Sequence, residues 1–173
     1  MPARMFEETV LPHLDAAFNY ARWLTRNDAD AEDVVQDACV RAMRFFSSLR
    51  DDNARPWLLA IVRNTWYSRV ARRPAASETT AFDNPQDEPT DESLDPEERL
   101  LQQHTVARVR AALERLPVDF REALVLREIE GLSYKEIASV LHVPLGTVMS
   151  RLARARERLT TVLRLVRPTE TLR

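Results

Sequence analysis

The chain has 173 residues, of which 45% are hydrophobic and 30% charged, as expected for one ordinary globular domain or two small ones. Its 2 glycines disfavour a turn-rich β fold, and its single Cys39 excludes an internal disulfide and suits a reducing compartment. No apolar run approaches the roughly 20 residues that span a bilayer, and no signal-peptide core follows the N-terminus. We therefore expect a cytoplasmic protein without direct membrane insertion.

The N-terminal third of the chain predicts helices. Apolar residues recur every three or four positions over residues 3–26, where Pro12 indicates either a kink or a later helix start. A second helix is predicted over about 30–46, with Asp28 and Asp30 as good capping residues. One face of this helix is apolar and the other is acidic.

A third helix and a linker follow. Pro56 suits the first turn of a helix over about 55–72, and residues 55–73 contain five Arg and no acid. Residues 74–95 are rich in proline and acid and poor in large apolar groups, which predicts a flexible linker. Fully extended, these residues would span on the order of 75 Å.

Helical order returns at Asp95, which precedes Pro96 and two acids as in a helix start. A further helix is expected to begin at Pro117 and to end at Gly131. The predicted fold class is therefore all-α, with two small helical domains joined by a flexible acidic linker.

The C-terminal segment predicts a helix-turn-helix. Ser133 and Glu136 have the spacing of a capping box at the start of a short helix, and we expect residues 142–146 to form a tight turn that contains Gly146. A long helix over about 147–166 then carries most of the six Arg found in residues 147–167. In such a motif the second helix enters the major groove, where Arg can read guanine edges.

Catalysis has no support in the sequence. The three histidines have no acid or serine at motif spacing, and there is no Cys/His metal spacing or phosphate-binding glycine loop. We expect no catalytic residue, no metal, no cofactor and no small-molecule substrate, and we expect Cys39 to be inertly buried.

Three stretches together resemble the extracytoplasmic-function (ECF) sigma factors of bacterial RNA polymerase. "DAEDVVQDACVRAMRFF" (30–46) resembles their core-polymerase-binding helix, and "RPWLLAIVRNTWYSRVARR" (55–73) their −10-element helix. The segment 116–159, which includes "GTVMSRLARAR", resembles their −35-element-binding domain. The resemblance implies a core-polymerase-binding and −10-recognition domain (1–73), a flexible acidic linker (74–95) and a −35-binding helix-turn-helix domain (96–173).

The resemblance also implies roles for individual residues. Core polymerase would be bound by Asp33, Gln36 and Asp37. The −10 element would be contacted by Arg63, Asn64, Tyr67, Ser68, Arg72 and Arg73, with Tyr67 as a candidate for base stacking, whereas Trp57 and Trp66 are expected in the core. The −35 element would be contacted by Lys135, Thr147, Met149, Ser150, Arg151, Ala153, Arg154, Arg156 and Arg158.

Within the −35 set we expect Arg154 to read a base, and Arg151 and Arg156 to hold phosphates. Met149 departs from the basic or polar residue common in the family, so readout there must be apolar or indirect. The implied partners are the largest subunits of core RNA polymerase, promoter DNA and an anti-sigma factor. Two alternatives stay open: a stand-alone helix-turn-helix regulator, and a sigma-like decoy that binds only an inhibitor protein.

Overall fold

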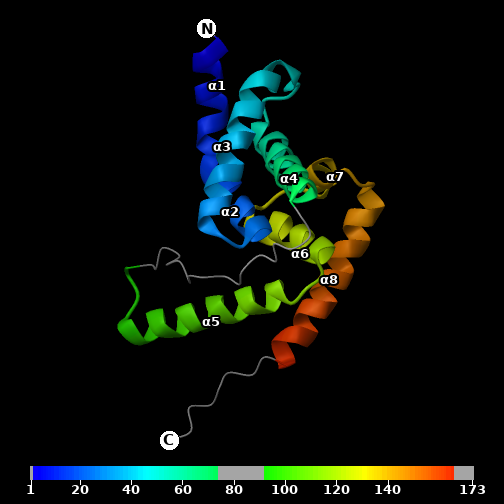
Figure 1. Cartoon of the computed structure of the whole chain (residues 1–173). Helices are drawn as coiled ribbons and strands as arrows, with labels where there is room; N and C mark the ends of the chain where they lie inside the picture. The colour runs from blue at the N-terminus through cyan, green and yellow to red at the C-terminus, as the bar shows by residue number, and fades with distance from the viewer. Residues whose placement is uncertain (1, 74–91, 166–173) are drawn as a thin grey trace, which may run out of the picture.

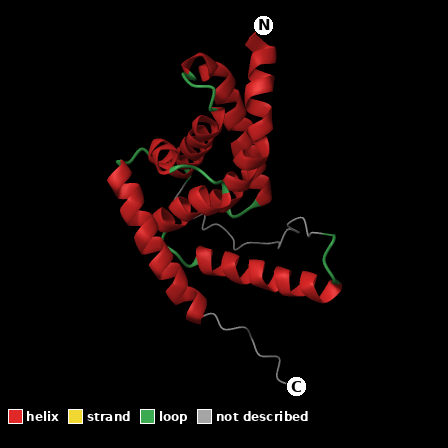
Figure 2. Cartoon of the chain, turned by 180° about the vertical axis from the view of Figure 1, so that it is seen from behind, coloured by secondary structure: helices red, strands yellow, loops and turns green. Residues whose placement is uncertain are grey.

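The computed structural model describes residues 2–73 and 92–165, and every regular element in these two stretches is helical (Figure 2). The first stretch contains α1 (Pro2–Val10), α2 (Leu14–Thr25), α3 (Asp28–Phe45) and α4 (Ala54–Arg72). The second contains α5 (Pro96–Glu114), α6 (Val118–Leu124), α7 (Tyr134–Leu141) and α8 (Leu145–Leu165). The predicted all-α fold class is confirmed. Most of the predicted linker, 74–91, lies outside the described residues, as does Val166 at the predicted end of the last helix.

Pro12 breaks the first predicted helix into two. α1 ends at Val10, a 3-10 turn covers Leu11–His13, and α2 begins at Leu14. Proline has no N–H to donate and its ring crowds the preceding turn, so the α-helical ladder cannot continue through it.

The start of α3 corrects one prediction. Asn27 has an extended backbone, and its side-chain carbonyl accepts a hydrogen bond from the Asp30 N–H at 3.1 Å. The expected caps, Asp28 and Asp30, instead lie in the first helical turn. Their negative charges there still favour the helix, because they face the positive end of its dipole.

The helix-turn-helix is confirmed, but its turn differs from the prediction. The Ser133 hydroxyl accepts a hydrogen bond from the Glu136 N–H, and the Glu136 carboxylate accepts one from the Ser133 N–H at 2.7 Å. At the end of α7 it is His142 that adopts the left-handed conformation, with φ 55°. Gly146 lies within the first turn of α8, so the expected role of this glycine in the turn is wrong. By contrast, Gly131 has φ 68°, as expected for a glycine that ends a helix.

The two halves of the chain pack against each other (Figure 1). α2, α3 and α4 form a bundle, α7 lies against α4, and a π-helical turn at Val125–Ile129 lies against α2. Buried residues from both halves belong to one hydrophobic cluster, whose fully buried members include Tyr20, Leu58, Leu126, Ile137 and Leu152.

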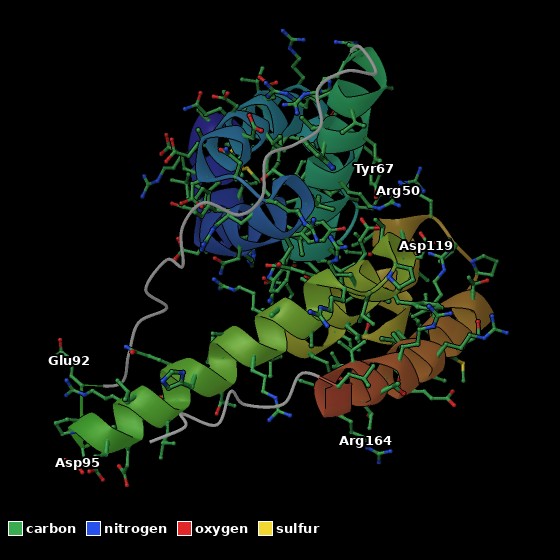
Figure 3. The ribbon with its side chains drawn as sticks, turned by 60° about the horizontal axis from the view of Figure 1, so that its bottom comes forward. Arg50, Tyr67, Glu92, Asp95, Asp119 and Arg164 are labelled. Carbon is green, nitrogen blue, oxygen red and sulfur yellow. The ribbon has the colours of Figure 1, made fainter. Side chains whose placement is uncertain are left out.

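α5 is largely separate from this core. Its C-terminal turn is anchored by buried Ala112 and Leu113, whereas Leu100 and Leu101 are 58% and 67% exposed. Figure 3 shows Asp95 at the outer end of this helix, remote from the bundle. The chain therefore enters the C-terminal half at a point far from its interface with the N-terminal half.

Candidate nucleic-acid and protein interfaces

The predicted polymerase-binding residues share one exposed face of α3. Asp33, Gln36 and Asp37 are all exposed, because Val34 and Ala38 on the opposite face are fully buried in the bundle. The periodicity of the helix thus places the two carboxylates and the amide together.

Asp37 already has a partner within the chain. Its carboxylate accepts a hydrogen bond from Arg69 of α4 at 2.9 Å, with the Asp37 side chain 56% exposed. An ion pair this exposed contributes at most about 1 kcal/mol, so it leaves Asp37 able to bind a protein partner.

The residues predicted to read the −10 element are divided between two surroundings on α4. Asn64 and Arg72 are exposed, and Ser68 is half-buried. Arg73 lies over the Trp66 ring at 5.5 Å and pairs with Asp30 of α3 at 3.5 Å. Of these four residues, Asn64 and Arg72 are the two that are open to solvent.

The indole side chains of this helix behave as expected. Trp66 is 8% exposed, and Trp57 packs against the core with its ring edge-on to Phe46 at 6.4 Å. The prediction that both tryptophans serve the core is confirmed.

Arg63 and Tyr67 lie on the side of α4 that faces the C-terminal half. The Glu122 carboxylate of α6, 3% exposed, accepts hydrogen bonds from Arg63 Nε at 3.1 Å and from the Tyr20 hydroxyl at 3.1 Å. Arg63 also lies 4.6 Å from the centre of the Tyr67 ring. Burial, followed by the negative charge of Glu122, raises the pKa of Tyr67 to about 12. Figure 3 shows Tyr67 at this junction.

Three more polar contacts cross between the halves. Arg55 donates to Glu130 at 3.0 Å, and Asn53 donates to Glu136 at 2.5 Å. Arg26 donates to the backbone carbonyl of Glu114 at 3.1 Å. In each charged or polar pair the N-terminal half supplies the donor and the C-terminal half supplies the acceptor.

The helix-turn-helix presents an open face on α8. Met149, Ser150, Ala153 and Arg154 are exposed, whereas Val148, Leu152 and Ala155 are fully buried against α6 and α7. Within the described ranges, 2–73 and 92–165, no carboxylate lies at ion-pair distance from Arg154. This side chain is therefore available to a ligand of the open face.

Three further Arg residues of the motif flank this face and contact side chains of their own domain. Arg156 pairs with Glu128 at 3.0 Å, and Arg151 lies 4.0 Å from Asp119. Arg158 lies over the Phe120 ring at 5.6 Å. Lys135 is exposed at the start of α7 and Thr147 is half-buried at the start of α8.

Buried carboxylates at the junction of the two halves are the feature that the sequence does not reveal. Glu122 and Glu130 are 3% and 4% exposed and both contact Arg residues of α4. Their partners lie 59 and 75 residues away, so no local pattern marks them.

Metal sites and membrane-spanning helices have no support among the described residues. Among the described residues no three His, Cys, Asp or Glu side chains are grouped as metal ligands would be. No helix in the same ranges is long and apolar enough to cross a membrane. Cys39 is half-buried on α3, and burial raises the pKa of its thiol.

Comparison with known proteins agrees with this arrangement. The family profile "Sigma-70 region 2" matches residues 9–75, which cover the bundle, and "Sigma-70, region 4" matches residues 107–159, which include α7 and most of α8. The RNA polymerase sigma-H factor of Pseudomonas aeruginosa is 37% identical over 161 residues, which are 89% of this chain and 83% of that protein. The ECF RNA polymerase sigma-E factor of Escherichia coli K12 is 40% identical over 135 residues, which are 74% of this chain and 71% of that protein.

A solved structure extends the likeness to the whole fold. The sigma factor RpoE of Bartonella quintana, determined in complex with the anti-sigma factor NepR, aligns with a TM-score of 0.72 and 30% identity over 95% of this chain and 99% of that one. The match to region 2 accounts for the N-terminal helices, which a stand-alone helix-turn-helix regulator would not need. The chain therefore belongs to the ECF sigma factors of bacterial RNA polymerase.

Proposed function

We propose that this protein binds core RNA polymerase through the exposed face of α3 and directs it to promoters by contacting the −10 and −35 elements. The observation that carries the proposal is the presence of three surfaces in one chain. They are the acidic-amide face of α3, the basic helix α4 and the open face of the helix-turn-helix.

Each surface has the chemistry its role requires. A carboxylate-bearing helix face gives orientation and a faster encounter with a basic partner surface. Planar and basic groups such as Tyr67 and Arg72 suit single-stranded DNA, whose bases stack and whose backbone is anionic. Arg154 at the open face of α8 suits the major groove of duplex DNA.

The functions divide along the domain boundaries expected from the sequence. Residues 1–73 bind polymerase and the −10 element, 74–95 link the domains, and 96–173 bind the −35 element. The protein acts in the cytoplasm, is not an enzyme, and uses binding energy to place a polymerase that performs the chemistry. An anti-sigma factor controls it, a role supported by the similar sigma factor RpoE of Bartonella quintana, which was solved in complex with the anti-sigma factor NepR.

The test is assembly with core polymerase, followed by size-exclusion chromatography. The variant Asp33→Lys/Asp37→Lys should fail to co-elute with core polymerase, because it reverses the charge of the α3 face. The matched control is Glu97→Lys/Glu98→Lys, which makes the same charge change at two exposed positions of α5. Loss of co-elution in both variants, or in neither, would contradict the assignment of this face.

A further control separates a direct role of Asp37 from its ion pair. Arg69→Ala removes the partner of Asp37 but leaves the carboxylate in place. We expect Arg69→Ala to assemble normally. If it behaves like the charge reversal, Asp37 acts only by positioning α4.

A further inference from the structure

The open face of α8 carries an apolar patch beside Arg154. The patch consists of four exposed residues, Leu145, Gly146, Met149 and Ala153. Each of the other three lies three or four positions from Met149, so Met149 is the centre of the patch. Its side chain is 53% exposed and is the longest of the four. Met149 is therefore the residue of this patch that reaches furthest from the helix.

Hydrogen-bond donors are scarce on the same face. The hydroxyl of Ser150 donates to the backbone carbonyl of Thr147 at 3.1 Å, so toward a ligand it is left as an acceptor. Arg154 is exposed, and no carboxylate within residues 2–73 and 92–165 pairs with it. Of the side chains exposed at positions 149, 150, 153 and 154, only Arg154 thus has donors to offer. The patch around Met149 offers a ligand apolar contact.

Gly146 indicates that something outside the chain comes close to this patch. A Cβ at Gly146 would meet no atom within 4 Å in the described part of the chain, and its φ is not in the left-handed region. Neither packing nor backbone conformation among those residues therefore requires a glycine. Glycine is also a poor helix former, but it lets a ligand approach the backbone. Close approach of a ligand to the start of α8 accounts for it.

The charge around the patch favours DNA over a protein as that ligand. Between Leu145 and Leu165, α8 contains five Arg and one Glu. Arg151 and Arg156 flank the open face, where the phosphates that border a major groove would lie. The N-terminal part of a recognition helix is also the part that meets base edges. The apolar patch therefore faces bases, with positive charge on both sides.

We propose that Met149 contacts the 5-methyl group of a thymine in the −35 element. Thymine is the base that presents a methyl group in the major groove, whereas the other bases present polar groups that a thioether would leave unpaired. The methionine side chain is flexible and polarisable, which suits it to pack against a methyl group. This inference rests on the proposed function and names the base that the patch selects.

The spacing along α8 predicts where this thymine lies. Met149 and Arg154 are five residues apart, which is about 7.5 Å along a helix axis. Successive base pairs are about 3.4 Å apart. The thymine should therefore lie within about two base pairs of the guanine that Arg154 reads.

The experiment replaces thymine by uracil, which keeps base pairing and removes only the 5-methyl group. The probe is a promoter duplex whose −35 element has been located by footprinting the holoenzyme, with each thymine of either strand replaced in turn. Affinity is measured for holoenzyme with the parent chain, with Met149→Ala and with Met5→Ala. Met5 is the matched control, because it is 59% exposed and lies on α1, away from α8 (Figure 1).

We expect one uracil substitution to weaken binding by the parent holoenzyme about fourfold, the value of one buried methyl group. Met149→Ala should weaken binding to the unmodified duplex by a similar factor, and uracil at that position should then have no further effect. Met5→Ala should behave as the parent at every position. Such coupling between one side chain and one methyl group identifies a direct contact.

Three results would overturn the proposal. They are a parent holoenzyme that is insensitive to every uracil, a uracil effect that persists in Met149→Ala, and a sensitive thymine more than about two base pairs from the guanine read by Arg154. Loss of assembly with core polymerase in Met149→Ala would also overturn it, because the patch would then serve a protein contact. If the parent holoenzyme protects no −35 element at all, the proposed function itself fails and this inference fails with it.

Discussion

Arg154 and Arg156 differ in a way that gives the sharpest prediction about DNA binding. Arg154 lies on the open face of α8, and no carboxylate in residues 2–73 or 92–165 is near enough to pair with it, whereas Arg156 lies beside that face and pairs with Glu128. We therefore expect Arg154 to reach base edges and Arg156 to reach the phosphate backbone.

The surroundings of Arg154 and Arg156 determine how much binding free energy each substitution should remove. A good Arg contact with a base is worth about 1–3 kcal/mol of discrimination, so Arg154→Ala should weaken binding by about that amount on the preferred −35 sequence only. Arg156 must exchange Glu128 for a phosphate. That ion pair is half-exposed and worth at most about 1 kcal/mol, so Arg156 still gains from the exchange.

The assay is holoenzyme binding to a set of single-base −35 variants at two salt concentrations. Arg154→Ala should flatten the preference at one or two base pairs. Arg156→Ala should lower affinity for all sequences alike and reduce the salt dependence by roughly one phosphate contact. If Arg154→Ala lowers affinity uniformly with base preferences intact, the proposed orientation of α8 in the groove is wrong.

Three further predictions concern the stability of the helix-turn-helix. Ser133→Ala should lower the free energy of unfolding by about 1 kcal/mol in denaturant titration, because it removes the side-chain cap of α7, and an unchanged midpoint would contradict that role. Leu152→Ala should cost about 2–5 kcal/mol because the side chain is fully buried, whereas Leu165→Ala, at a position 74% exposed, should cost almost nothing in the same titration. Burial alone would raise the pKa of Glu136, but hydrogen bonds from the Ser133 backbone and from Asn53 outweigh it and hold the pKa below its ordinary value of 4.5. Since the folded-state pKa is the lower one, this carboxylate stabilises the protein fully above about pH 4.5, and the contribution disappears as the pH falls through the folded-state pKa. Unfolding titrations between pH 6 and 3 should therefore show a steeper loss for the parent chain than for Glu136→Gln, and equal slopes would contradict this.

Periodicity was sufficient to predict the helices and most of their buried faces. The buried line of α8 through Val148 and Leu152 recurs every three or four residues, so it is visible in the sequence alone. The capping box at Ser133 is equally local, since its two hydrogen bonds join residues three apart. Both features were therefore predicted correctly.

The wrong predictions concern positions where several neighbouring residues could fill the same structural role, as a helix cap or as the residue in a turn. Asn27, Asp28 and Asp30 are all acceptable caps, and only the extended backbone at Asn27 decides among them. Gly146 was expected in the turn because glycine tolerates any conformation, yet His142 adopts the left-handed one. Residue type alone therefore does not show which of several neighbouring residues caps a helix or adopts the left-handed conformation.

The relation between the domains was beyond sequence reasoning. Glu122 meets Tyr20 and Arg63 from 102 and 59 residues away, and nothing in its own helix distinguishes it from a solvent-exposed glutamate. Contacts of this kind depend on how the surfaces of the two folded halves pack against each other, so only the folded structure reveals them.

The most direct test of the central claim is run-off transcription with purified core RNA polymerase on a library of genomic fragments, with and without this protein. We predict new transcripts that begin at discrete sites only when the protein is present, with shared −35 and −10 sequences upstream, whereas the protein alone binds the same duplexes weakly. The same transcripts with and without the protein, together with tight sequence-specific binding of duplex DNA by the protein alone, would contradict its role as a sigma factor.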